Sequence, residues 1–234
     1  MSNDITTPEK IVHDWAIRDY KNLDLAEFSL KILPQYVKTG LLVADVGCGY
    51  GRHMVYFHLK GSQTVGIEYD LEYAIKEAQE RTKNLGLSLP IIRADARAIP
   101  LRSSTFDIVL CMGSALSEKH WLWLTKEDRR KWIMEMTRIC KLGGTILVEV
   151  GNRYTSLRAC AGWIKHYLVA IKSILTGGKV EIGDYYEKEL GCWFHDFTIK
   201  EIKEMFSDLP VNIQIHKPNK FFFPLFLALA QKKG

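Results

Sequence analysis

Cysteine is scarce in this 234-residue chain, since its five cysteines are odd in number and no two have C-x-x-C spacing. This pattern excludes a disulfide framework and a zinc site built on paired thiolates, and it favours a reducing compartment. The first four residues are polar and show no secretory leader. The longest apolar run, residues 221–230, contains Pro224. It is far shorter than the roughly 20 residues that span a bilayer. We therefore expect a cytoplasmic protein without a transmembrane segment.

Neither sign of charge dominates the composition. The chain has 32 basic and 27 acidic residues, which gives a net charge of +5. A charge of this size permits an anionic partner but does not by itself indicate nucleic-acid binding. The apolar fraction of 47% is enough for an ordinary core, and the length suits one domain.

The most informative segment that is present is a glycine-rich turn after an apolar run. Residues 41–51 read LLVADVGCGYG, with Asp45 near the end of the run and glycines at every second position thereafter. Glycine lacks a Cβ, so the backbone turns sharply and a ligand can lie against it. A strand, glycine loop and helix hold nucleotide-like ligands in doubly wound α/β proteins. The spacing differs from the dinucleotide pattern G-x-G-x-x-G, because Arg52 occupies the third glycine position.

Four further segments follow in order over residues 41–150, where apolar strands alternate with helical stretches. The first, TVGIEYD, carries Glu68, and the second, IIRADA, carries Asp95. The third is IPLRSSTFDIVL at 99–110, and the fourth is CKLGGTILV at 140–148. Such alternation favours a parallel sheet.

In this order the segments resemble the class I S-adenosylmethionine-dependent methyltransferases, in the broad group that includes the ubiquinone and menaquinone methyltransferases. The resemblance implies an α/β fold with a doubly wound, seven-stranded, mostly parallel sheet. Its last strand would be antiparallel, helices would cover both faces, and a helical cap would be inserted after strand 5. S-adenosylmethionine would be the cofactor, and its methyl group would be transferred by in-line displacement.

The resemblance also assigns roles to individual residues. The acid at 45 would order the loop and help to meet the methionine ammonium, and the acid at 68 would take the ribose hydroxyls. Residues 95 and 96 would read the adenine edge, and residues 112 and 113 would lie beside the methyl donor. The alternative is that the glycines serve only a tight turn and the acids lie on the surface. The predicted cofactor-binding residues are Asp45, Gly47, Cys48, Gly49, Gly51, Glu68, Tyr69, Asp95, Ala96, Met112 and Gly113.

We expect a single domain with four parts. Residues 1–40 would form a helical lid that begins at Thr7 and Pro8, and residues 41–150 the cofactor-binding core. Residues 151–197 would form a substrate cap with a helix at 157–175. Residues 198–234 would supply a last helix and the final strands. Other helices are predicted at 71–84 and from a capping box at Thr125 to about residue 141, and a second capping box stands at Thr198.

Two histidines are candidate catalytic groups, because an imidazole can act as a base near neutral pH. His120 follows the fourth predicted strand, and His195 lies near the end of the predicted cap. Either could instead be a loop or interface residue. No metal-ligand spacing is present, and no metal is expected.

The prediction of the substrate class rests on a motif that the chain lacks and on the aromatic content of the cap. Residues 110–114 read LCMGS and lack the Asn-Pro-Pro-Phe type of motif that relatives acting on exocyclic amino groups carry. A small apolar or aromatic acceptor is the leading hypothesis, motivated by Trp163, Tyr167, Tyr185, Tyr186, Trp193 and Phe194. The alternatives are a tRNA-modifying methyltransferase, a noncatalytic partner of another subunit and, more distantly, a nicotinamide oxidoreductase. RNA is therefore a candidate partner, and the pattern specifies no oligomeric state.

Overall fold

The computed structural model describes residues 25, 27–69, 74–113, 115–117, 124–155, 157–188, 192–218 and 225–234. The helical segments are α2 (Glu27–Ile32), η1 (Leu33–Gln35), α3 (Arg52–Leu59), α4 (Lys76–Asn84), η3 (Ala115–Ser117), α5 (Lys126–Ile139), α6 (Leu157–Leu175) and α7 (Ile199–Met205). The strands are β1 (Leu42–Val46), β2 (Gln63–Glu68), β3 (Ile91–Arg93), β4 (Phe106–Cys111), β5 (Cys140–Gly151), β6 (Asp184–Glu187), β7 (Cys192–His195), β8 (Val211–His216) and β9 (Leu225–Lys232).

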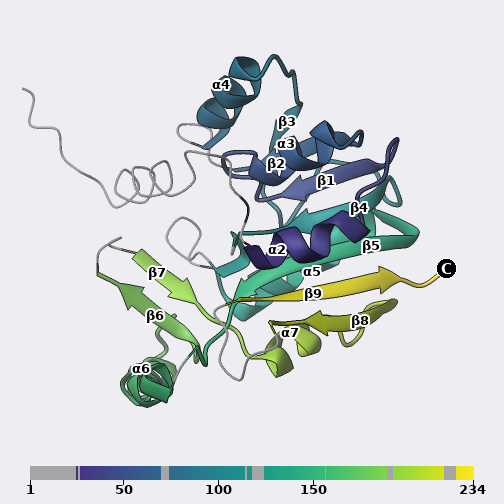
Figure 1. Cartoon of the computed structure of the whole chain (residues 1–234). Coiled ribbons are helices and arrows are strands. Elements are labelled where there is room, and N and C mark those ends of the chain that lie inside the picture. Colours follow the sequence, from purple (N-terminus) through teal and green to yellow (C-terminus); the bar gives the residue numbers. More distant parts are fainter. Residues whose placement is uncertain are drawn as a thin grey trace, which may run out of the picture.

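Seven strands form one sheet in the order β3-β2-β1-β4-β5-β9-β8 (Figure 1). The pairs from β3 to β5 are parallel, and β9 runs antiparallel to both β5 and β8. The order reverses between β1 and β4, which is where open α/β sheets bind ligands at the carboxyl ends of their strands. The predicted doubly wound sheet with an antiparallel last strand is confirmed.

The sheet is buried on both faces by different helices. Ile108 and Leu110 of β4 pack in a cluster with α2, η1 and α3. The alternate residues Val109 and Cys111 pack in a larger cluster with α5 and α7. Successive strand residues point to opposite faces, so a strand covered on both sides is apolar throughout. This explains why residues 108–111 show no polar alternation.

Local sequence signals placed several helix boundaries correctly. Thr125 and Thr198 each accept a hydrogen bond from the third backbone N–H of their helix, and Asp128 and Glu201 complete the two capping boxes. The helix predicted at 157–175 coincides with α6. The predicted helix at 71–84 is seen as α4 with residues 74 and 75 before it, and residues 71–73 lie outside the described residues. Thr7 and Pro8 also lie outside them.

Two predicted segments differ in part from the structure. The helix α5 ends at Ile139 rather than near residue 141, because β5 begins at Cys140 and continues through the expected glycine turn. The insertion after β5, called the cap segment below (residues 151–197), is only partly helical. Its second half is an antiparallel pair of strands, β6 and β7, which lies with α6 beyond the carboxyl end of β5 (Figure 1).

A membrane-spanning helix is not found in the part of the chain that the structure describes.

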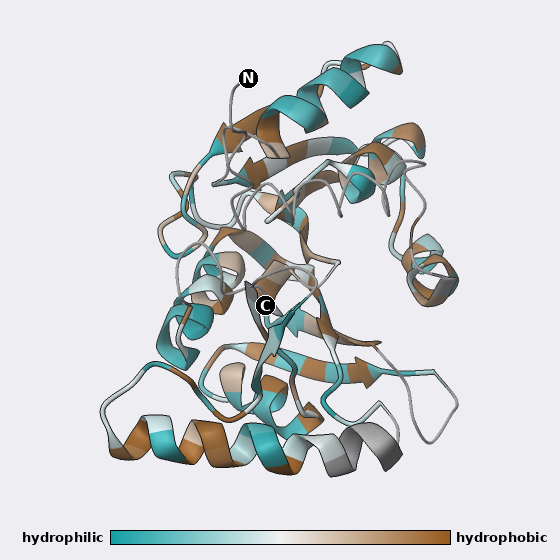
Figure 2. Ribbon diagram, turned by 90° about the vertical axis from the view of Figure 1, so that its left-hand side faces the viewer, coloured by the Kyte–Doolittle hydropathy of each residue, from teal (hydrophilic) through white to brown (hydrophobic). Residues whose placement is uncertain are grey.

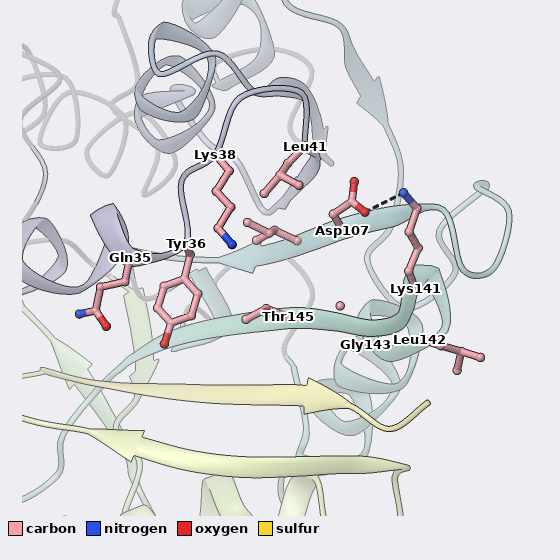
Figure 3. A pocket seen from close by; sticks show the side chains of 11 residues that line it. Gln35, Tyr36, Lys38, Leu41, Asp107, Lys141, Leu142, Gly143 and Thr145 are labelled. Carbon is pink, nitrogen blue, oxygen red and sulfur yellow. Dashed lines mark hydrogen bonds and ion pairs between the residues drawn. The ribbon is translucent and has the colours of Figure 1, made fainter.

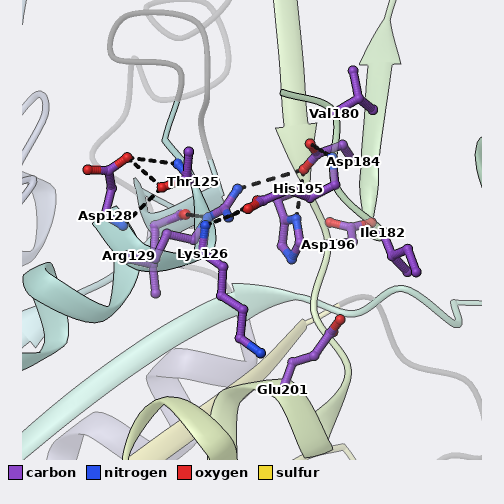
Figure 4. Close-up of polar contacts among 12 residues, drawn as sticks. Thr125, Lys126, Asp128, Arg129, Val180, Ile182, Asp184, His195, Asp196 and Glu201 are labelled. Atoms are coloured by element: carbon purple, nitrogen blue, oxygen red, sulfur yellow. Dashed lines mark hydrogen bonds and ion pairs between the residues drawn. The ribbon is translucent and has the colours of Figure 1, made fainter. Parts of the chain in front are cut away.

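The cap segment is joined to the core by a buried charge. Arg129, near the start of α5, is fully buried and donates from Nε to the Leu116 carbonyl at 3.3 Å. Its Nη1 donates to Glu181 at 2.9 Å, and its Nη2 lies 3.7 Å from the Asp184 carboxylate (Figure 4). The guanidinium also lies 5.7 Å from the ring centre of Phe197. One side chain of α5 therefore contacts η3, the end of the connection that leads into β6, and the first residue of β6.

Replacing Arg129 with Met tests this joint. Removing one member of a buried ion pair leaves the remaining charges uncompensated and costs about 3–5 kcal/mol of unfolding free energy. For a domain of this size we expect the melting temperature to fall by roughly 10 °C. The matched control is Arg130→Met, because Arg130 pairs with the exposed Asp208 at the surface and should contribute little. Equal melting temperatures for the two variants would contradict the assignment.

Candidate functional site

The glycine loop after β1 is held against β2 by its own backbone. The N–H groups of Gly47 and Cys48 donate to the Ile67 carbonyl at 2.8 and 3.2 Å. Gly47, Gly49 and Gly51 have φ values of 71°, 49° and 76°, in the left-handed region that glycine adopts without strain. A Cβ at Gly47 would lie 2.9 Å from the Cβ of Ala115, whereas a Cβ at Gly49 would meet nothing within 4 Å. Gly47 is thus required for packing, and Gly49 borders open space.

Asp45 is a buried carboxylate whose two oxygens have no hydrogen-bond partner among the described residues. Burial raises its pKa to about 7, and the nearby Glu68 charge adds to this effect while Arg52 opposes it. Nearly all buried polar groups in folded proteins are satisfied, so an unpaired one at the carboxyl edge of a sheet is a candidate for binding a ligand. A cationic ligand group would both pair with this carboxylate and lower its pKa.

Glu68, at the end of β2, closes the loop from the other side. Its Oε2 accepts from the Gly49 N–H at 2.9 Å and its Oε1 from the Tyr69 N–H at 2.7 Å. A carboxylate has about four lone-pair sites, so a group of this kind is also suited to accept hydrogen bonds from two vicinal hydroxyls. The Tyr69 ring is partly exposed, with the Arg93 guanidinium 5.9 Å from its centre.

Asp95 differs from the other predicted cofactor residues because its carboxylate already has a strong partner. Arg97 donates to it from the backbone and from the guanidinium at 2.6–3.1 Å, and also donates to Asp128 at 2.9 Å. The hydrogen bonds from Arg97 hold the pKa of Asp95 below its usual range. Ala96 beside it is buried. The adenine-binding role of these two residues stays a prediction.

Gly113 and Met112, predicted beside the reacting methyl group, lie at the carboxyl end of β4. The Gly113 N–H donates to Glu149 Oε2 at 3.0 Å, and Ser29 of α2 donates to the other oxygen of the same carboxylate. Glu149 was not among the residues predicted from the sequence, although an acid within the apolar run at 146–150 was a visible signal. It is buried on β5 and joins the N-terminal helix α2 to the loop after β4.

The structure describes one of the two candidate catalytic histidines. His120 lies outside the described residues. His195 is buried in β7, with its Nδ1 2.7 Å from Asp184 Oδ1 (Figure 4). Burial lowers its pKa to about 4 in spite of the hydrogen bond to Asp184, so the ring is neutral at physiological pH. An imidazole whose pKa lies this far below neutral is a weak base. The catalytic roles of His120 and His195 stay predictions.

The same cluster has the outline of a metal site. Ligand atoms of Glu181, Asp184 and His195 lie within 4.8 Å of one another. The guanidinium of Arg129, however, already lies against both carboxylates, as described above. Since a cation is built into the cluster, we assign these residues to the joint between the cap segment and the core.

A pocket of about 290 Å³ opens in the cap segment. Burial raises the pKa of its Asp196 to about 6, with the Arg153 charge opposing the shift. The Asp196 carboxylate lies directly against the Cα of Gly151, the last residue of β5. The pocket, called the cap pocket below, is lined by Arg153, Thr155, Gly162, Trp163, His166, Tyr185 and Asp196.

A second pocket, of about 310 Å³, lies at the opposite, amino-terminal edge of the sheet (Figure 3). Its walls include Tyr36, Lys38 and the residues around Gly143. Lys141 and Asp107 within it pair with each other at 2.7 Å. It is far from the glycine loop along the strands, so we do not assign the ligand site there.

Comparisons with known proteins agree with this geometry. Residues 43–144 match the family model described as Methyltransferase domain. An uncharacterized protein from Methanocaldococcus jannaschii is 26% identical over 74% of this chain and 57% of its own length. A tRNA (carboxymethyluridine(34)-5-O)-methyltransferase from Mus musculus is 26% identical over 80% of this chain, which spans only 24% of that protein. A solved S-adenosylmethionine-dependent methyltransferase from Methanosarcina mazei has a TM-score of 0.71 at 22% identity, covering 90% of this chain and 99% of its own.

Residues 43–144 therefore match a methyltransferase domain, and the fold is that of solved S-adenosylmethionine-dependent methyltransferases. The cofactor that these comparisons support is S-adenosylmethionine. The residues present fit that cofactor, because the unpaired Asp45 carboxylate suits its ammonium group and Gly49 leaves space beside Glu68. The narrower resemblance to quinone methyltransferases stays a prediction.

Binding of S-adenosylmethionine is expected to depend on pH through Asp45. Only the ionised carboxylate attracts the ligand ammonium, and with a pKa of about 7 most of it is protonated at pH 6. The dissociation constant measured by calorimetry should rise about tenfold between pH 8 and pH 6. Asp45→Asn should abolish this dependence. In the control variant Asp95→Asn the dependence should persist, since the Asp95 pKa lies below that window.

Glu68→Gln should weaken S-adenosylmethionine binding about tenfold to a hundredfold. The amide keeps one acceptor oxygen but loses the charge, and hydrogen bonds to charged groups contribute about 1.5–3 kcal/mol. Calorimetric titration measures the change, and Glu127→Gln, at an exposed position of α5, is the control. Equal affinities in the two variants would exclude the ribose role of Glu68.

Proposed function

We propose that this protein transfers the methyl group of S-adenosylmethionine to a small apolar or aromatic acceptor held in the cap pocket. The observation that carries the proposal is the position of that pocket. Its Asp196 carboxylate lies against Gly151 at the carboxyl end of β5, which is the strand next to β4. Neighbouring strands are about 4.8 Å apart, so the pocket adjoins the loop at Gly113 where the methyl donor is expected.

The walls of the cap pocket suit a flat, apolar group. Trp163 and Tyr185 meet edge to face with ring centres 5.8 Å apart, and Tyr185 stacks on Phe194 at 5.9 Å. Aromatic walls with a few polar groups are typical of small-molecule sites. Arg153 is not a free cation in this pocket, because its guanidinium donates to both oxygens of Glu201 at 2.7 Å.

The chemistry divides between cofactor and protein. The sulfonium of S-adenosylmethionine supplies an already activated methyl group. The glycine loop, Glu68 and the cap pocket bring the acceptor atom into line, and such positioning can lower a barrier by roughly 7–11 kcal/mol. Where the acceptor is a hydroxyl or an N–H, Asp196 accepts the proton that it loses. The pKa of about 6 at Asp196 leaves it mostly ionised at neutral pH.

Asp196→Asn is expected to lower kcat by about 10²–10⁴ while the affinity for S-adenosylmethionine stays unchanged. In the parent protein activity should rise with pH through about 6, because the carboxylate must be ionised to take a proton. The variant should lose this rise. Initial rates across pH 5–8 measure both effects, once an acceptor has been found by labelled methyl transfer into fractionated extract.

Two further variants make the Asp196 test specific. Gly151→Ala would push a Cβ into the Asp196 carboxylate and should also lower kcat. Asp208→Asn changes an exposed acid of the surface pair with Arg130 and should leave kcat unchanged. Full activity in both Asp196→Asn and Gly151→Ala would refute the role of Asp196.

A second candidate acceptor is tRNA. The observation that favours it is the resemblance over most of the chain to the mouse tRNA methyltransferase described above. A single base is also a small aromatic group that the cap pocket could receive. Ribonuclease treatment that removes the transferred label, together with a steep salt dependence of RNA binding, would select this alternative. Label that stays in the organic or small-molecule fraction would select the first.

A further inference from the structure

The cap segment has a charge pattern that methyl transfer does not explain. From residue 150 to residue 180 the chain contains no aspartate or glutamate. The basic residues in this stretch are Arg153, Arg158, Lys165, Lys172 and Lys179. Most of the stretch is the helix α6, and the side chains of the three lysines are exposed. Arg153 is buried and paired with Glu201, so the positive surface consists of Lys165, Lys172 and Lys179, and the same stretch of chain contains no acid to compensate them.

The outer face of α6 is apolar as well as basic. Ile164, Leu168 and Leu175 are 63%, 64% and 80% exposed, and Ile171 lies in the same row. Their spacing of four, three and four residues places them on one stripe of a helix. Lys165 and Lys172 each follow a stripe residue, so they lie about 100° around the helix, along one flank. This set of four apolar residues and two lysines is called the α6 stripe.

The inner face of α6 is different. Trp163 and Ala170 are buried, and Trp163 and His166 line the cap pocket. The helix therefore uses one side to pack against β6 and turns the α6 stripe away from the protein. In Figure 2 α6 lies along one margin of the molecule, with hydrophobic bands over much of its length. Exposed apolar surface that is gathered on one element marks an interaction site.

We propose that the α6 stripe seats the protein on an anionic lipid surface, with α6 lying in the plane of the interface. An amphipathic helix with large apolar residues on one side and lysines beside them is the pattern that binds such surfaces. The apolar row enters the boundary between headgroups and acyl chains. Lys165 and Lys172 extend their ammonium groups sideways to the lipid phosphates. The seated helix would bring the cap pocket beside the membrane.

Charge complementarity favours lipid over the other occupants. A second copy of this chain, packed stripe to stripe, would set the lysines of two acid-free helices against each other. An RNA would pair with the lysines but would leave the apolar row in water. An anionic bilayer satisfies both features at once, because phosphates and hydrocarbon occur within the same few ångströms.

Vesicle sedimentation tests the proposal with the full chain. We expect the parent protein to bind phosphatidylcholine vesicles that contain phosphatidylglycerol, and to bind pure phosphatidylcholine vesicles at least tenfold more weakly. Leu168→Gln combined with Leu175→Gln should lower binding to the anionic vesicles at least tenfold. Lys165→Gln combined with Lys172→Gln should remove the preference for anionic lipid.

The matched control changes two exposed leucines elsewhere, Leu59→Gln and Leu85→Gln, and should bind like the parent. All four proteins should show the same melting temperature and the same S-adenosylmethionine affinity, because the altered side chains lie on the surface. The proposal is overturned if the parent ignores anionic vesicles, or if the leucine variant in α6 binds as the parent does. A dimer in light scattering that only the α6 leucine variant loses would assign the stripe to a second copy instead.

Discussion

The geometry of this protein depends on one positive charge that has no contact with water. Arg129 is fully buried at the start of α5 and is held by the Leu116 carbonyl on one side and by Glu181 and Asp184 on the other. Taking a guanidinium out of water costs several kcal/mol, so it is tolerated only where its partners are fixed in place. Since those partners belong to the segment after β4 and to the cap segment, the charge sets where the cap pocket stands relative to the core.

Two kinds of carboxylate can be told apart at the carboxyl edge of the sheet. Asp45 is buried and Asp196 is half-buried, and loss of contact with water raises the pKa of each. Asp95 and Asp128 share the guanidinium of Arg97, and the pKa of each is lowered. Raised pKa values in a cleft are typical of groups that wait for a ligand or a proton, whereas paired acids stabilise the fold. The first pair stands in the two places where cofactor and acceptor are proposed to meet.

Much of the fold could be predicted because its signals are local. The glycine loop, both capping boxes and α6 depend on residues close together in the sequence, and their side chains act on the backbone beside them. Glu149 and Asp196 could not be recognised in the same way. Glu149 joins Ser29 to Gly113, and Asp196 faces Gly151, so each role depends on neighbours that only folding supplies. The strand pair β6 and β7 was not predicted, because the two short aromatic segments show no sequence pattern that distinguishes a buried face from an exposed one.

By itself, the sequence determined the fold class: the order of its apolar strands gives the parallel sheet, and the Asp45–Gly51 loop and the acid that ends β2 predict a cofactor site, because such a site is built where consecutive strands end. The acid-free composition of α6 was also already present in the sequence. Only the tertiary structure decided which acids are unpaired, that His195 is bound within the joint at Arg129, and that α6 turns its leucines outward. Burial and pairing are properties of the packed chain, since each depends on what distant segments bring to the same place.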